Sequence, residues 1–319
     1  MTALLDVETV SCPLGCPPDD EFVLLGHDRL HGVAGEFPVL RCCHCGLLRT
    51  SPRPTPSAIQ RYYPAAYAPY ASTIVAPERR NATPAPGRKL SLSRLLKPRT
   101  NVLPAIPPGR LLEIGCGSGA FLHGMAQSGW EVEGLELSRA AGEEARGLGF
   151  PVFIGSLAEA PDPIKPFDLV VGWMVLEHLH DPVEMLQKLR RWSAPGGWLV
   201  LSVPDAGALE FKIFRDAWYA LDVPRHLFHF TARTARLVLS QAGWRIERVM
   251  WHDNPNNLIL SLRNRCEERD WLRAANLLRD VADGRRCGRL RLVLGRLLGS
   301  LRASGRMTLW ARHAESSEK

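Results

Sequence analysis

The 319-residue sequence predicts an α/β protein whose doubly wound, Rossmann-like sheet follows a small cysteine-rich leader. Three observations carry this prediction. A strand, a glycine turn, a helix and a second strand follow one another between residues 110 and 136. Strand and helix patterns then alternate as far as residue 313, as they do in a sheet with helices on both faces. Finally, five of the eight cysteines lie before residue 50.

The segment 110–136 reads RLLEIGCGSGAFLHGMAQSGWEVEGLE and organises the rest of the chain. An apolar strand over 111–114 ends at a turn containing Gly115, Gly117 and Gly119, and an amphipathic helix and a strand ending in Glu136 follow. Glycines let the backbone turn tightly and approach a ligand closely. A carboxylate at the tip of the second strand can accept hydrogen bonds from both ribose hydroxyls. The layout therefore predicts a nucleoside-binding unit.

Two classes of nucleoside ligand fit this unit. Gly115, Gly117 and Ala120 match the dinucleotide fingerprint G-x-G-x-x-A. Glu113, however, precedes the first glycine by two residues, which is awkward beside a pyrophosphate but suits a ligand with an ammonium group and a sulfonium. The turn with Glu113 and Glu136 resembles the S-adenosylmethionine site of class I methyltransferases. That resemblance implies S-adenosylmethionine as the cofactor, bound by the two acids and the three glycines of the turn.

The elements after Glu136 continue the alternation. Ser138 is placed to cap a helix, and Asp181-Pro182 starts another with proline in its first turn. We expect helices over 138–146, 181–193 and 231–243, and strands over 151–155, 169–173, 198–203, 244–251 and 306–313.

Residues 167–205 resemble the same family through several separate motifs. An aspartate precedes the strand at 169–173, Glu-His-x-x-Asp-Pro spans 177–182, Pro-Gly-Gly spans 195–197 and Val-Pro-Asp spans 203–205. The resemblance argues against a dehydrogenase and implies a seven-stranded sheet whose last strand is antiparallel. Further cofactor contacts are expected from Leu137, Ser156, Leu157 and Trp173, with Ser156 and Leu157 near the adenine.

Methyl transfer from a sulfonium needs alignment more than activation, because the leaving group is already good. The enzyme must place the acceptor in line with the methyl carbon and exclude water. A hydroxyl acceptor also needs a base. His178 follows the fourth strand, close to the expected methyl position, and is the first candidate; His226 is the second. A histidine beside a helix start can equally be structural.

The loop 206–231 contains FRDAWYALDVPRHLFHFT and is predicted to be irregular. It follows the fifth strand at the ligand-facing edge of the sheet, where loops carry substrate contacts. We expect Asp222, Arg225 and His229 to contact the substrate, with Arg225 pairing with an anionic acceptor. The alternative is that the histidines satisfy local backbone groups.

The leader carries two cysteine clusters, Cys12-x-x-x-Cys16 and Cys42-x-x-Cys45. They predict a zinc ribbon in which four thiolates replace the core that so short a segment cannot build. Cys43 and the histidine after it are spare donors. The sequence RCCHCGLLRTSPRPTPSAIQRYY resembles the zinc-ribbon leader of many bacterial class I methyltransferases.

We divide the chain into a leader over 1–60, a linker over 61–105 and a methyltransferase domain over 106–319, with a helical insert at about 254–302. The insert is rich in arginine, and its apolar residues recur at helical spacing over Leu290–Leu301. Such a helix can cover the protein's own core or lie on an anionic membrane surface. Both interpretations stay open.

The formal charge of +7 and the pI near 9.1 fit an acidic partner or simply a basic solvated surface. No signal peptide or membrane span is apparent, so we expect a cytoplasmic protein with an optional peripheral membrane contact. The resemblance favours a small-molecule or glycan acceptor. An RNA or protein methyltransferase and a non-catalytic cofactor-binding scaffold are the alternatives, although no aromatic–basic platform for single-stranded nucleic acid is visible. The sequence leaves the oligomeric state open.

Overall fold

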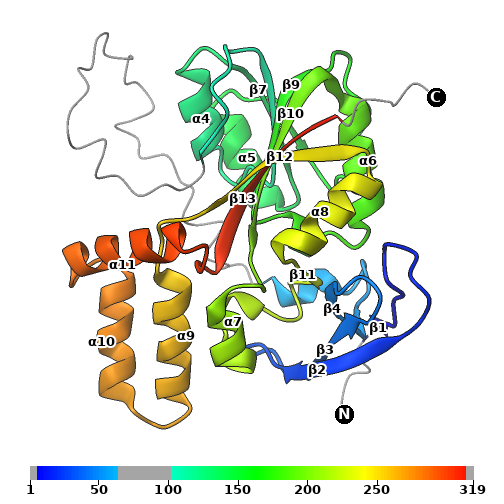
Figure 1. The fold of residues 1–319 in the computed structure, drawn as a ribbon. Helices are drawn as coiled ribbons and strands as arrows, with labels where there is room; N and C mark the ends of the chain where they lie inside the picture. The colour runs from blue at the N-terminus through cyan, green and yellow to red at the C-terminus, as the bar shows by residue number, and fades with distance from the viewer. Residues whose placement is uncertain (1–5, 64–101, 314–319) are drawn as a thin grey trace.

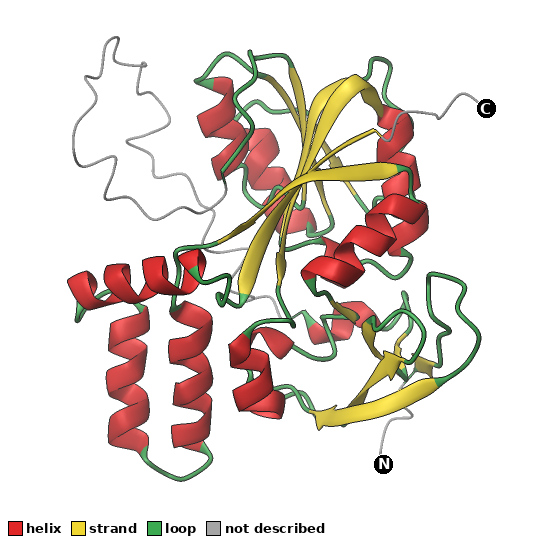
Figure 2. Ribbon diagram, viewed as in Figure 1, coloured by secondary structure: helices red, strands yellow, loops and turns green. Residues whose placement is uncertain are grey.

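The computed structural model describes residues 6–63 and 102–313 and shows a layered α/β body beside a smaller leader (Figures 1 and 2). The body is built on a seven-stranded sheet in the order β12-β13-β10-β9-β6-β7-β8. The leader contains a two-stranded and most of a four-stranded sheet. Most of the linker expected over 61–105 lies outside the described residues.

The large sheet consists of β6 (Arg110–Ile114), β7 (Glu131–Glu136), β8 (Val152–Ile154), β9 (Phe167–Trp173), β10 (Ser193–Pro204), β12 (Trp244–Trp251) and β13 (Arg306–His313). Its helices are α4 (Ala120–Ala126), α5 (Arg139–Gly147), α6 (Pro182–Trp192) and α8 (Ala232–Gln241). Strands β6 to β10 pair in parallel, whereas β13 runs antiparallel between β10 and β12. The predicted seven-stranded sheet with an antiparallel last strand is confirmed.

Side chains at the helix starts explain why these boundaries could be predicted. The Ser138 hydroxyl accepts a hydrogen bond from the Ala141 backbone N–H, and Asp181 Oδ1 accepts one from Glu184 N at 3.1 Å. Each bond satisfies an N–H group that the first helical turn leaves without a partner. The α6 helix ends earlier than expected, at Trp192, because Ser193 already pairs with Phe167 as the first residue of β10.

The sheet buries apolar residues on both faces, with a period of two. Leu111, Leu169 and Val200 pack toward α4 and α5, whereas their neighbours Leu112 and Val170 pack toward α6 and α8. A strand that is apolar at every position is the signature of a sheet covered on both sides. The carboxyl ends of the parallel strands are therefore the edge at which ligands can reach the sheet.

The loop 206–231 is more regular than predicted. It contains helix α7 (Leu209–Phe214), two short 3-10 turns and strand β11 (Phe228–His229). Strand β11 pairs with β4 (Leu48–Thr50) of the leader, and the sheet continues through β3 (Phe37–Cys42) to β2 (Asp20–Gly26). The remaining leader strands, β1 (Val7–Glu8) and β5 (Arg53–Pro54), pair with each other. The prediction that this loop is irregular was therefore wrong. Strand β11 could not be recognised from the local sequence because its partner, β4, lies in the distant leader.

The insert forms three helices, α9 (Asn256–Glu267), α10 (Leu272–Ala282) and α11 (Gly288–Ser300). On α11, Gly295 and Gly299 are buried against the backbone of His252 and Asp253. The opposite side carries Leu290, Val293, Leu297 and Leu301, each between 52% and 67% exposed among the described residues. The expected core packing therefore does not hold for these four residues, whereas Leu294 and Leu298 of the same apolar repeat are half-buried. Across residues 6–63 and 102–313, none of the helices has the length and apolar character that spanning a membrane requires.

Candidate functional site

The glycine turn lies at the carboxyl edge of the sheet, between β6 and α4. Gly115, Gly117 and Gly119 all have positive φ, at 69°, 52° and 85°. A Cβ at Gly115 would also lie 2.8 Å from Val175 Cγ2. The turn is fixed by two bonds in which the backbone N–H groups of Gly115 and Cys116 donate to Leu135 O. Glycine is thus required here for backbone conformation as well as for space.

The two predicted acids lie on adjacent strands beside this turn. Glu136 Oε2 accepts a hydrogen bond from Gly117 N at 2.8 Å, and its Oε1 accepts one from Ser138 N at 2.7 Å. Glu113 is 3% exposed, and its Oε2 has no hydrogen-bond partner among the described residues. Burial raises the pKa of Glu113 well above its usual value, and the negative charge of Glu136 raises it further.

The other expected cofactor residues follow neighbouring strands at the same edge. Leu137 is 42% exposed directly after β7, while Leu157 is buried after β8. Ser156 is tied locally, because its hydroxyl donates to Glu159 Oε2 at 2.6 Å. Trp173 ends β9; its ring meets Phe121 edge-on, and its indole N–H is buried without a described partner.

These residues fit the cofactor that the family implies. A ligand ammonium would supply the partner that Glu113 Oε2 lacks, and it would offset the repulsion between Glu113 and Glu136. The Glu136 oxygens each keep a second lone pair for a ribose hydroxyl. Glu113 and Glu136 would therefore hold the two polar ends of S-adenosylmethionine, with the glycine turn between them.

A second polar cluster follows β9, formed by the 3-10 turn Leu176–His178 and the loop residue His226. The rings of His178 and His226 meet edge-on with centroids 4.7 Å apart. Glu177 is fully buried, both of its oxygens lack described partners, and burial raises its pKa to about 8. The Nε2 atom of His226 lies 3.9 Å from Glu177 Oε1.

Burial lowers the pKa of both histidines to about 3, so they are neutral bases at ordinary pH. For His178 the charge of His226 adds to that effect, and for His226 the charge of His229 does. Each ring places Nδ1 against a backbone carbonyl, Arg225 O at 3.0 Å for His178 and Ala220 O at 2.9 Å for His226. The ligand atoms of Glu177, His178 and His226 lie within 4.8 Å of one another, so the cluster could also hold a metal ion.

Sequence reasoning missed the residues opposite this cluster. Glu210 is 1% exposed without a described hydrogen-bond partner for either oxygen, and burial raises its pKa to about 7. Arg306 begins β13; burial lowers its pKa, while Glu177, Tyr219 and Glu210 attract its charge. The expected antiparallel direction of the last strand could have revealed Arg306, because such a strand begins at the sheet edge where its parallel neighbours end.

Two of the three expected substrate residues, Arg225 and His229, are engaged with the leader. Arg225 is fully buried, and its guanidinium donates to both oxygens of Asp28, to Asp222 Oδ1 and to Tyr62 O. His229 is buried in β11 with Nε2 3.3 Å from Thr50 Oγ1. We therefore revise the expectation that Arg225 and His229 contact the acceptor, because their polar atoms serve contacts between the loop and the leader. Asp222 accepts from Arg225 within the loop, and its Oδ2 lies 3.7 Å from His226 Nε2, so its expected contact with the acceptor stays a prediction.

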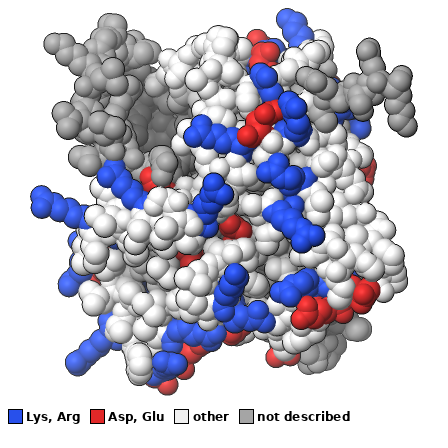
Figure 3. Space-filling model, in the orientation of Figure 1, with Lys and Arg blue, Asp and Glu red and all other residues white. Residues whose placement is uncertain are grey.

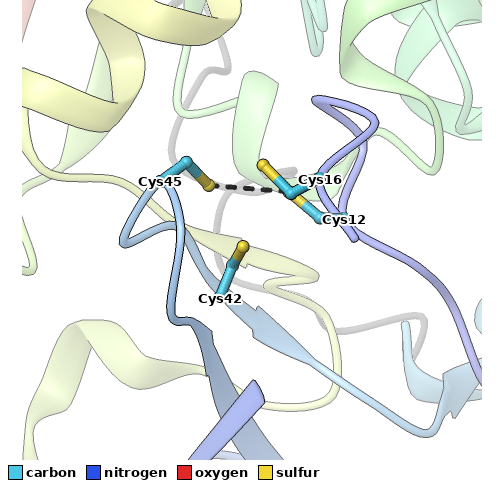
Figure 4. A group of neighbouring side chains, drawn as sticks. All are labelled: Cys12, Cys16, Cys42 and Cys45. Atoms are coloured by element: carbon cyan, nitrogen blue, oxygen red, sulfur yellow. Dashed lines mark hydrogen bonds between the residues drawn. The ribbon is translucent and has the colours of Figure 1, made fainter. Parts of the chain in front are cut away.

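The four predicted cysteines come together in the leader (Figure 4). Cys12 and Cys16 face Cys42 and Cys45 from a separate loop, with the Sγ atoms of Cys12 and Cys45 3.5 Å apart. All four sulfur atoms lie within 4.8 Å of one another. Cys43, the spare donor, is exposed and outside this group.

The quartet fits a tetrahedral zinc ion. Zn–S bonds of about 2.3 Å place sulfur atoms roughly 3.8 Å apart, close to the separation present here. Burial raises the pKa of Cys16 to about 11, with a further contribution from the Cys12 thiol. A bound cation would supply the charge that several crowded thiolates require.

Comparison with known proteins agrees with this geometry. Residues 88–249, just over half of the chain, match the family model described as a methyltransferase domain. A ubiquinone biosynthesis O-methyltransferase from Alkalilimnicola ehrlichii is 36% identical over 100 residues, which cover 29% of this chain and 40% of that protein. A probable S-adenosylmethionine-dependent methyltransferase from Mycolicibacterium smegmatis is 32% identical over 142 residues, or 44% of this chain and 53% of that protein.

The chain thus spans about half the length of these curated relatives or less. A solved S-adenosylmethionine-dependent methyltransferase from Mesorhizobium loti aligns with a TM-score of 0.45 at 19% identity, covering 69% of this chain and 95% of that one. On the strength of the family model, this chain belongs to the methyltransferase-domain family.

Proposed function

We propose that the chain transfers the methyl group of S-adenosylmethionine to a hydroxyl of a small molecule, with His178 as the base. The observation that carries the proposal is that two buried carboxylates with unsatisfied oxygen atoms lie at the same edge of the sheet. Among the described residues, Glu113 Oε2 has no hydrogen-bond partner beside the glycine turn, and neither oxygen of Glu177 has one beside His178. Buried polar groups without partners are expensive, so both positions are suited to groups that a ligand supplies.

The chemistry requires little from the protein beyond alignment and proton removal. S-adenosylmethionine supplies an electrophilic methyl group whose S–C bond electrons leave with the sulfur. The acceptor oxygen forms the new bond to carbon while its proton passes to His178 Nε2. His178 is suited to this role because its Nδ1 faces the Arg225 carbonyl, which leaves Nε2 with the lone pair. His226 is the second candidate for the same role.

A polar, hydroxyl-rich acceptor of the sugar or glycan type suits the residues around His178. Glu210, Tyr219 and Arg306 offer an acid, a phenol and a guanidinium that lie close enough to interact electrostatically, and Arg306 also interacts with Glu177. Several relatives carry O-methyltransferase in their names, which supports transfer to oxygen. An RNA or protein acceptor is the alternative that the assay below must separate.

A structural zinc ion on Cys12, Cys16, Cys42 and Cys45 is a further part of the proposal.

We also propose a peripheral contact between α11 and an anionic membrane. The exposed apolar row of α11 is flanked by Arg289 and Arg302, and Figure 3 shows basic side chains along the edge where α10 and α11 lie. Apolar and cationic groups on one helix match an anionic lipid surface.

The test is a methyl-label transfer screen. Full-length protein is incubated with methyl-labelled S-adenosylmethionine and panels of sugar nucleotides, glycans and phenols, with bulk RNA and protein as separate panels. We expect label in a hydroxylated small molecule and a loss of roughly a hundredfold in turnover for His178→Ala. His27→Ala, which changes an exposed leader histidine, should keep full turnover. Label found only in RNA or protein would contradict the acceptor class, and full turnover in His178→Ala would contradict the base.

A further inference from the structure

The leader contacts the loop 206–231 through residues that both precede and follow His226. Strand β11 pairs with β4 through Phe228↔Arg49 and His229↔Leu48. Just before it, Thr50 N donates to Leu227 O at 2.9 Å, and Thr50 Oγ1 donates to His226 O at 2.8 Å. The backbone that carries the acceptor-site residues is therefore held by a segment more than 170 residues earlier in the chain.

Arg225 adds a buried ion pair to these contacts between the loop and the leader. Its Nη2 donates to Asp28 Oδ1 at 2.6 Å, its Nη1 to Asp28 Oδ2 at 3.0 Å, and Nη1 also to Tyr62 O at 2.9 Å. In the structure the leader extends beyond residue 60, through the 3-10 turn Ile59–Tyr62 to Tyr63, so Asp28 and Tyr62 both belong to it. Asp222 in the loop accepts from the same guanidinium. A bidentate Arg–carboxylate pair fixes orientation as well as distance. The main chain of Arg225, including its carbonyl, is thereby anchored to the leader.

That carbonyl is one of two groups that face the Nδ1 atom of His178. Arg225 O lies 3.0 Å from Nδ1, and the hydroxyl oxygen of Tyr63 lies 2.9 Å from it. A carbonyl can only accept a hydrogen bond, so Nδ1 carries the proton and donates it. The neutral ring then keeps its lone pair on Nε2, and Tyr63 adds a second acceptor for the same N–H.

We propose that Tyr63 is a positioning residue for His178. Together with the Arg225 carbonyl, its hydroxyl holds the Nδ1–H tautomer and the ring orientation that present Nε2 to the acceptor. The leader thus supplies a functional part of the acceptor site in addition to its own fold. This inference rests on the proposed role of His178 as base. When Nε2 takes the acceptor proton, the two oxygens at Nδ1–H stabilise the resulting imidazolium, as an orienting group does in a catalytic triad.

The experiment compares Tyr63→Phe with Tyr62→Phe in the full-length, zinc-loaded protein saturated with S-adenosylhomocysteine. Tyr62 is a matched control because it is the adjacent residue, its ring packs edge-on against Phe37, and the substitution keeps its main-chain carbonyl. Histidine ring nitrogens labelled with ¹⁵N report the tautomer directly, and the His178 signals are assigned by their loss in His178→Gln. Zinc content and thermal melting are recorded for each variant to confirm that it is folded.

We expect wild-type His178 to be the Nδ1–H tautomer. Its ring signals should shift or broaden in Tyr63→Phe and stay in place in Tyr62→Phe. With the acceptor identified by the label screen, Tyr63→Phe should lower kcat roughly tenfold and leave the acceptor KM unchanged. An Nε2–H tautomer in the wild type overturns the proposal whatever the variants do. So do unchanged His178 signals or an unchanged kcat in Tyr63→Phe.

The two hypotheses can fail separately. If the label screen finds no acceptor, the tautomer measurement still decides whether Tyr63 orients His178. If His178→Ala keeps its turnover while Tyr63→Phe shifts the His178 signals, the orientation holds and the assignment of the base falls.

Discussion

Replacing Glu136 with glutamine tests the cofactor site at its most constrained carboxylate. Glu136 is 4% exposed and accepts one backbone hydrogen bond on each oxygen, from Gly117 N and Ser138 N. A glutamine amide has one accepting oxygen, so in Glu136→Gln its NH₂ group must face one of these two donors. The variant loses one charge-assisted hydrogen bond inside the fold and one to the ribose. Each such bond contributes about 1.5–3 kcal/mol.

We therefore expect Glu136→Gln to bind S-adenosylmethionine and S-adenosylhomocysteine roughly ten- to a hundredfold more weakly, and to lose about 1.5–3 kcal/mol of stability. Titration calorimetry measures the affinities, and chemical denaturation measures the free energy of unfolding. Glu131→Gln is the control, because this residue begins the same strand with its side chain 68% exposed. A folded Glu136→Gln protein with wild-type affinity would refute the ribose assignment. Tight NAD binding without S-adenosylmethionine binding would refute the cofactor.

Three other predictions concern the metal, the pH dependence and the insert. Elemental analysis should find one zinc per chain that is lost in Cys45→Ser but kept in Cys116→Ser; a metal-free wild type purified without chelator would contradict the ribbon. Burial lowers the pKa of four histidines to about 3, so below about pH 6.5 they take up protons only on unfolding, and each lowers the free energy of unfolding by about 1.4 kcal/mol per pH unit as pH falls. Burial raises the pKa of Glu177 to about 8 and that of Glu210 to about 7, so these two carboxyl groups take up protons on folding and act in the opposite sense. As pH falls from 6.5 to 5, the free energy of unfolding should therefore decrease more in Glu177→Gln than in the wild type; an equal change in the two proteins, at constant zinc content, would contradict the raised pKa of Glu177. The protein should co-sediment with anionic vesicles and dissociate as salt rises, whereas a variant with Leu290 and Leu297 changed to aspartate should stay in solution; equal binding by both proteins would reject the α11 contact.

Sequence alone determined the large sheet and its cofactor edge. The signals that predicted it are local: the glycine spacing, the Ser138 and Asp181 caps and the apolar patterns of the strands and helices. Each signal determines the structure of residues only a few positions away in the sequence. The two cysteine clusters are also local signals, although they face each other only once the strands between them pair. For this reason most predicted element boundaries from residue 110 onward agree with the structure to within a few residues; the exceptions are the start of β10, which begins five residues early, and the loop 206–231, which contains α7 and β11.

Only the tertiary structure decided which residues meet across long separations. Arg225 and Asp28 are 197 residues apart, and the sequence around either gives no sign of the other, so an arginine expected to bind substrate became a buried junction. Tyr63 and Arg306 were likewise not predicted as site residues. Tyr63 meets His178 from 115 residues away in the sequence, and Arg306 is placed by the antiparallel direction of β13. The apolar row of α11 is a second example of what the sequence alone could not predict. Periodicity reveals that a helix has an apolar face, but whether other parts of the protein cover that face is a property of the packed fold.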